Sequence, residues 1–128
     1  GNTEAMAKAV EEGAKGKGAD VTEFGASDFD AAKVADYDAI AFGCPAMGAE
    51  VLEEGEFQPM WDDVKGSLSG KKIALFGSYG WGSGEWMDSW KEDAEGAGAQ
   101  LAVAPVMANN EPDDDALAQC KALGEALA

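Results

Sequence analysis

A tryptophan between glycines is the residue of this chain best suited to contact a ligand. Residues 77–84 read Gly-Ser-Tyr-Gly-Trp-Gly-Ser-Gly, with Trp81 near the centre. Such a loop gives a large apolar ring little local support for burial, so the ring exposes a face beside flexible backbone. The pattern predicts a lid over a flat aromatic ligand. Trp86 and Trp90 differ, because their i, i+4 spacing on an expected helix favours packing in the core.

Two further segments could bind a ligand through backbone groups. Gly1-Asn2-Thr3 stands directly before an expected helix, where exposed N–H groups, a hydroxyl and the helix dipole favour a phosphate. Taken alone, such a triplet is more often a simple N-cap. In residues 44–50, Gly48 permits backbone conformations that other residues avoid. Taken alone, that segment is an ordinary turn.

The charge and the residue types exclude several other chemistries. The 128 residues include nine lysines, no arginine and 25 acids, which gives a formal net charge of −16. Binding a polyphosphate needs a basic face, so a nucleic-acid partner is excluded. The absence of histidine excludes Ser-His-Asp and Cys-His catalysis as well as His-ligated metals.

The cysteine count and the hydropathy pattern indicate where the protein works. Cys44 and Cys120 are the only cysteines, so neither a disulfide scaffold nor a four-cysteine zinc site is possible, and we expect a reducing cytoplasm. The sequence has no apolar run approaching the ~18 residues of a membrane span, so we expect a soluble protein with no membrane partner. The length suits one compact unit over residues 1–128.

The candidate loops follow an alternation of helices and strands. Helices are expected at residues 3–17, 29–35, 57–68, 85–97 and 113–127, and strands at residues 20–24, 39–44, 72–77 and 100–107. The runs at 39–44 and 72–77 are apolar on both faces, which is typical of buried parallel strands. This alternation predicts a parallel sheet covered by helices on both faces. Ligands of such sheets bind at the carboxyl edge, where the candidate loops would lie.

In combination and in this order, the loop motifs resemble those of the flavodoxins, most closely the short-chain bacterial type that binds FMN non-covalently. The resemblance extends from Gly1-Asn2-Thr3-Glu4 through residues 46–50 and 77–82 to Asn110-Glu111-Pro112-Asp113. It implies an α/β fold of three layers, with a doubly wound parallel sheet of order 2-1-3-4-5. The first strand of that order and the first half of the phosphate loop are absent from this sequence, which we expect to be N-terminally incomplete. We therefore expect four parallel strands, with a gap one strand wide between residues 20–24 and 39–44.

The resemblance also implies a set of FMN-binding residues, with no catalytic residue and no metal. Backbone N–H groups and side chains at the start of the chain would hold the phosphate, Met47 and Trp81 would cover the inner and outer faces of the ring, and Glu50 would accept a hydrogen bond from N3–H. The carbonyl of Gly48 would turn toward N5–H on one-electron reduction, a change that costs a residue without a Cβ little. The implied set is Gly1, Asn2, Thr3, Ala46, Met47, Gly48, Ala49, Glu50, Ser78, Tyr79, Gly80, Trp81, Gly82 and Asn110.

The implied function is that of a low-potential one-electron carrier that cycles between semiquinone and hydroquinone and has no substrate-transforming activity. Acids at residues 50–56 and 111–115 surround two of the loops. They would disfavour the anionic reduced cofactor and steer basic-surfaced redox partners to a monomeric carrier. Two alternatives remain open: an FMN-dependent oxidoreductase of the quinone-reductase kind, and a cofactor-free binding module on the same scaffold.

Overall fold

The computed structural model describes residues 2–44, 55–79, 85–109 and 111–128. The helices are α1 (Asn2–Gly16), α2 (Ala31–Val34), α3 (Phe57–Val64), α4 (Glu85–Gly96) and α5 (Asp114–Leu127), with 3₁₀ turns η1 (Ala26–Asp28) and η2 (Lys65–Ser67). The strands are β1 (Ala39–Gly43), β2 (Lys72–Tyr79), β3 (Gln100–Leu101) and β4 (Val106–Asn109). The expected alternation of helices and strands is therefore confirmed over most of the described chain.

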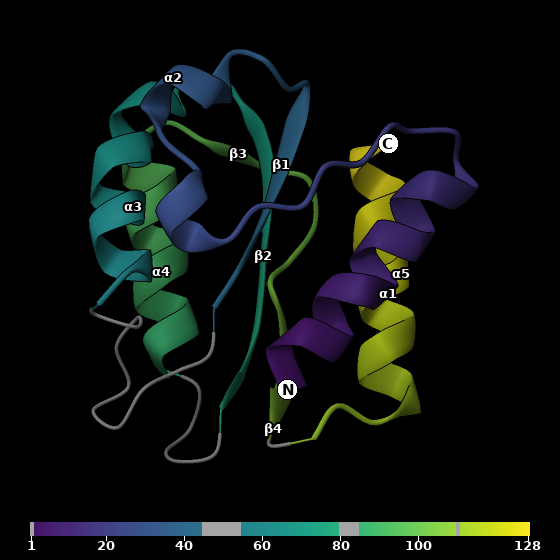
Figure 1. Ribbon diagram of the computed structural model, residues 1–128. Coiled ribbons are helices and arrows are strands. Elements are labelled where there is room, and N and C mark those ends of the chain that lie inside the picture. The colour runs from purple at the N-terminus through teal and green to yellow at the C-terminus, as the bar shows by residue number, and fades with distance from the viewer. Residues whose placement is uncertain (1, 45–54, 80–84, 110) are drawn as a thin grey trace.

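A parallel sheet forms the middle layer of the molecule, and β2 is its central strand. Ile40 of β1 pairs with Ile73 of β2, and the other edge of β2 pairs first with β3 and then with β4. Helices α3 and α4 cover one face of this sheet, and α1 and α5 cover the other (Figure 1). The three-layer α/β architecture expected from the sequence is thus present.

Side-chain alternation along β2 supplies both halves of the core. Ile73 and Leu75 pack with Trp61 and Trp90 on the side of α3 and α4. Ala74 and Phe76 belong to the second cluster, on the side of α1 and α5. Successive side chains of a strand point to opposite faces of the sheet. Because both faces of β2 are covered by helices, its residues are apolar on both faces and do not alternate between apolar and polar.

Two of the expected strands differ in the structure. Residues 20–24 form no strand, and no described strand lies paired beside them, so their prediction was wrong. A strand needs a hydrogen-bonded neighbour. Phe24 instead packs its ring against Phe29 and Tyr37, with centroids 5.3 and 5.9 Å away. The four strands that do form are all parallel, but they come from residues 39–109.

The strand expected at residues 100–107 is divided into β3 and β4. The N–H of Ala102 still donates to the carbonyl of Ile73, at 3.0 Å. Pairing with β2 resumes only at Val106, directly after Pro105. Proline has no N–H to give to a ladder, which accounts for the interruption.

Helices α1 and α5 lie against each other through two glycines. A Cβ on Gly13 would overlap the carbonyl oxygen of Lys121, and a Cβ on Gly124 would overlap the carbonyl oxygen of Val10. Backbone therefore meets backbone at this crossing, which fixes how α1 sits on the sheet. None of the described helices is long and apolar enough to cross a membrane.

Candidate cofactor site

The carboxyl ends of the strands and the N-terminal ends of the long helices lie at one edge of the molecule. Strands β1, β2 and β4 all run toward this edge, and α1, α4 and α5 begin there (Figure 1). The first N–H groups of a helix have no partner within the helix. The first N–H groups of α1, α4 and α5 therefore point to the carboxyl edge of the sheet, which is the ligand side of a parallel sheet.

Two hydroxyl groups meet at this edge from opposite ends of the sequence. Thr3 Oγ1, in the first turn of α1, lies 2.9 Å from Ser78 Oγ, next to the last residue of β2. Ser78 is a buried polar residue, with only 6% of its surface exposed. Either hydroxyl can donate in this pair, so one donor group remains available to a third partner.

Strand alternation explains why Ser78 faces α1. Ala74 and Phe76 point to the side of α1 and α5, so Ser78, two residues farther along β2, follows them. Tyr79 points the other way and packs, partly buried, against the core under α3 and α4. Both residues were expected in a loop, and the structure corrects this by placing them in the last two positions of β2, paired with Ala108 and Asn109 of β4.

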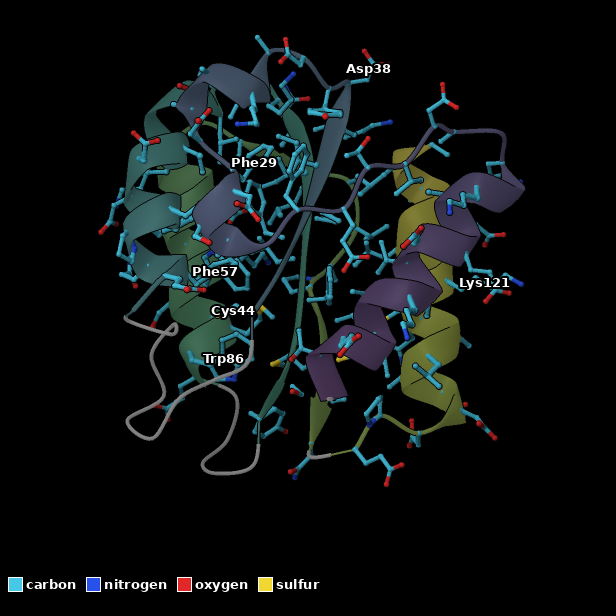
Figure 2. The ribbon with its side chains drawn as sticks, in the orientation of Figure 1. Phe29, Asp38, Cys44, Phe57, Trp86 and Lys121 are labelled. Carbon is cyan, nitrogen blue, oxygen red and sulfur yellow. The ribbon has the colours of Figure 1, made fainter. Side chains whose placement is uncertain are left out.

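At Gly77, the residue before Ser78, the backbones of β1 and β2 leave no room for a side chain. The Cys44 N–H donates to the carbonyl of Phe76 at 3.2 Å. A Cβ on Gly77 would overlap the Cys44 carbonyl oxygen and meet the ring of Trp86. Figure 2 shows Trp86 and Cys44 at the lower end of the sheet. The close approach sets where the two following loop segments leave the sheet.

Trp86 and Trp90 are buried in the core of the α3 and α4 side, each with 2% of its surface exposed. Their rings are stacked, with centroids 6.0 Å apart. The prediction that their spacing indicates core packing is confirmed.

Most of the remaining predicted site residues lie outside the described residues. They are Gly1, Ala46, Met47, Gly48, Ala49, Glu50, Gly80, Trp81, Gly82 and Asn110. Asn2 is the first residue of α1. Within the described part of the chain, the structure brings Thr3 and Ser78 together and places Tyr79 on the opposite face of the sheet.

Sequence reasoning missed the contact between Thr3 and Ser78 and the part played by Gly77. The signal for Ser78 was present, since extending the alternation of Ala74 and Phe76 by one step places its hydroxyl on the side of α1. No sequence pattern signalled the contact at Gly77, because it depends on the spacing of β1 and β2.

Both edges of the sheet carry charged side chains. Acids occupy the first turns of α4 (Glu85 and Asp88) and α5 (Asp114 and Asp115). Their negative charge interacts favourably with the positive end of the helix dipole. Asp113 caps α5 by accepting from the Ala116 N–H at 2.8 Å. The opposite edge, where helices end and strands begin, carries both signs of charge. Its lysines include Lys15, Lys65, Lys71 and Lys72, and its acids include Asp38 and Glu95.

The donor set at the carboxyl edge suits a phosphate ester. Hydroxyls and helix N–H groups bind phosphate without a charged side chain. The loops at this edge contain no lysine, since none occurs between residues 34 and 64 or between residues 73 and 90.

The flavodoxin family model matches residues 1–124 of the chain. This chain belongs to the flavodoxin family. The flavodoxin of Megasphaera elsdenii is 48% identical over 128 residues, covering 100% of this chain and 91% of its own length. That of Clostridium beijerinckii is 42% identical over 128 residues, with 100% and 92% covered.

Solved structures agree with this assignment. The solution structure of two-electron reduced Megasphaera elsdenii flavodoxin superposes with a TM-score of 0.90 at 48% identity, covering 99% of this chain and 90% of that chain. A flavodoxin from the domain Archaea gives 0.84 at 32% identity, with 99% and 88% covered. The expected fold class is confirmed. As a flavodoxin, the chain is an FMN-binding electron carrier that acts with redox partner proteins, not an enzyme.

Proposed function

We propose that the FMN phosphate is held at the start of α1, with Thr3 and Ser78 as its hydroxyl donors. The single observation that carries this proposal is their 2.9 Å contact at the carboxyl edge of the sheet. The contact leaves one hydroxyl hydrogen free, and the first N–H groups of α1 point to the same edge. Gly1 and Asn2 complete the phosphate site at the beginning of this helix.

The flavin ring lies between the segments that follow β1 and β2. Met47 covers its inner face, Trp81 covers its outer face, and Glu50 accepts a hydrogen bond from it. The segments that carry them are residues 46–50 and 80–82, with Asn110 after β4. Support comes from the sheet: β1 and β2 are paired neighbours whose close approach at Gly77 makes both segments begin side by side.

The carrier operates at low potential and meets basic partners. FMN supplies one-electron redox chemistry when bound, and the protein sets its orientation and field. Acids in the first turns of α4 and α5 make the addition of negative charge at this edge unfavourable. The same field attracts a partner with a basic surface to the edge. We further propose that the protein acts as a monomer and a single domain in the cytoplasm.

Comparing FMN with riboflavin, which lacks the phosphate, tests the proposed site. Ser78→Ala removes one hydroxyl without adding volume. A hydrogen bond to a charged group contributes about 1.5–3 kcal/mol, so FMN should bind about 10- to 150-fold more weakly to the variant. Riboflavin affinity should change little. Binding is followed by quenching of flavin fluorescence on titration with protein.

Ser89→Ala provides the matched control, because Ser89 is an exposed serine of α4. Both affinities should remain at the level of the unchanged protein. An equal loss for FMN and riboflavin in Ser78→Ala, or no loss for either, contradicts the proposed phosphate site.

A further inference from the structure

The outer edge of β1 is open in the part of the chain that the structure describes. β1 pairs with β2 on one side, and none of the described strands lies on its other side. The strand is nevertheless apolar on both faces, as is typical of a strand inside a sheet. Ile73 and Leu75 of β2 are fully buried, whereas Ile40 and Ala41, their neighbours in β1, are partly exposed. Solvent therefore reaches β1 from its outer edge.

The alternation of backbone direction along β1 shows which groups point to the open edge. The Cys44 N–H donates to the Phe76 carbonyl, so the backbone groups of Cys44 point toward β2. This direction alternates from one residue to the next in a strand, so Ala39, Ala41 and Gly43 direct their N–H and C=O groups away from β2. Among the described residues these groups have no backbone partner. Such an edge is a template for one more strand, here about five residues long.

Partly buried apolar side chains flank the open edge on both faces of the sheet. On the side of α3, the ring of Phe29 lies 6.3 Å from that of Phe42 and also packs on Phe24. On the side of α1, Ala41 and Ala9 are both partly buried against the core. A strand added at this edge would therefore meet apolar surface on both faces, so its own side chains should be apolar on both faces.

The end of the sheet where β1 begins is acidic on the side of this strand. Asp36 and Asp38 precede β1 and are exposed. Figure 2 shows Asp38 at the end of the sheet opposite Cys44. A parallel strand begins at this same end, so a lysine in its first positions would lie next to these carboxylates. The net charge of −16 also favours a basic segment over an acidic one.

We propose that the outer edge of β1 binds an extended segment of another polypeptide, apolar on both faces and with lysine at its amino end, which adds to the sheet as a parallel strand. The outward backbone groups of β1 supply affinity, and the apolar surfaces on the two faces select the side chains. The inner edge of β1 already holds a segment of this chemistry. There residues 72–76 run parallel to β1, and residues 71 and 72 are lysines.

Hydrogen exchange followed by NMR on the full chain tests this binding edge, with a synthetic peptide of the sequence of residues 71–77 as the probe. Amide exchange at Ala39, Ala41 and Gly43 should slow about tenfold when the peptide is present at ten times its dissociation constant. Ile40 and Phe42, which already bond to β2, should change much less. A paramagnetic label at the carboxyl end of the peptide should broaden Gly43 more than Ala39, because the added strand is parallel. No flavin is added, so the result does not depend on the proposed phosphate site.

A matched peptide separates strand pairing from charge. N-methyl groups on the amides of its apolar residues keep the charge and the side chains but remove the donors, so this peptide should not protect the three amides. Equal protection by both peptides, or no protection by either, overturns the proposal. Protection that rises with protein concentration instead of peptide concentration also overturns it, because a second copy of the chain would then occupy the edge.

Ala41→Pro tests the same edge from the side of the protein. It removes one outward N–H and none of the bonds to β2, so the peptide should bind about fivefold more weakly or worse. Ala41→Ser is the matched control, because it keeps the backbone N–H, and it should bind the peptide as the original protein does. Circular dichroism checks that both variants are folded. Equal peptide affinity of a folded Ala41→Pro protein and the original contradicts pairing at this edge.

Discussion

Substituting Gly124 by alanine tests how α1 is held in position. Gly124 lies inside α5, and its Cβ would overlap the carbonyl oxygen of Val10 and lie 3.0 Å from the backbone nitrogen of Ala14. Both neighbours are backbone atoms of α1, so no side-chain rotation can relieve the overlap. The two helices must move apart, and the apolar contacts around Met6 and Leu123 loosen with them.

The expected change in the free energy of unfolding has two opposing contributions. Alanine is favoured over glycine inside a helix by about 1 kcal/mol. Overpacking costs about 1–3 kcal/mol, and a clash with backbone belongs at the upper end of this range. The net destabilisation is therefore about 2 kcal/mol. For a chain of this length that corresponds to a melting temperature lower by roughly 6–10 °C.

Thermal unfolding followed by circular dichroism, at one fixed FMN concentration, measures this shift. Gly16→Ala is the matched control, because Gly16 is the last residue of the same α1 and has nothing within 4 Å of its added Cβ. It should leave the melting temperature unchanged or raise it slightly. A Gly124→Ala protein as stable as the original would refute the account of the α1–α5 contact.

Three further predictions concern a buried thiol, the proposed lid and the charged edge. Burial raises the pKa of the Cys120 thiol from 9.0 to about 11, so the unfolded chain loses its proton first and stability should fall between these pH values. Urea unfolding at several pH values should show a smaller loss of unfolding free energy with rising pH in Cys120→Ala. An equal loss in the variant and the original protein would contradict this prediction. Trp81→Ala should raise flavin fluorescence and weaken FMN binding by about 1–3 kcal/mol, the contribution of one aromatic stack; unchanged emission would place Trp81 away from the ring. Electron transfer to a basic haem protein should slow steeply as ionic strength passes 0.1 M, where the Debye length is about 10 Å. A rate independent of salt would mean that the acids keep the protein in solution but do not attract its partner.

The buried strands and the long helices could be predicted from the sequence, because their apolar patterns are local. The runs at 39–44 and 72–77 became β1 and β2, and the burial of Trp86 and Trp90 followed from their spacing. Residues 20–24 show the limit of this reasoning. Their composition suits a strand, but pairing depends on a neighbour that local sequence does not specify.

The candidate site was predictable in kind but not in geometry. Motif order indicated an FMN site, and the α1 start and the end of β2 do meet at Thr3 and Ser78. Thr3 and Ser78 are 75 positions apart in the sequence, so only the folded chain brings them into contact. The tight approach at Gly77 and the hydrogen bond from the Trp61 N–H to Asp93 likewise depend on how β1, β2, α3 and α4 are packed.

The most direct test of the low-potential one-electron carrier is a potentiometric titration of the FMN-loaded protein, followed by its visible spectrum. We expect two one-electron steps at clearly separated potentials, with the second step well below that of free FMN, because the acids at the carboxyl edge oppose the final negative charge. A single two-electron step near the potential of free FMN would contradict the account.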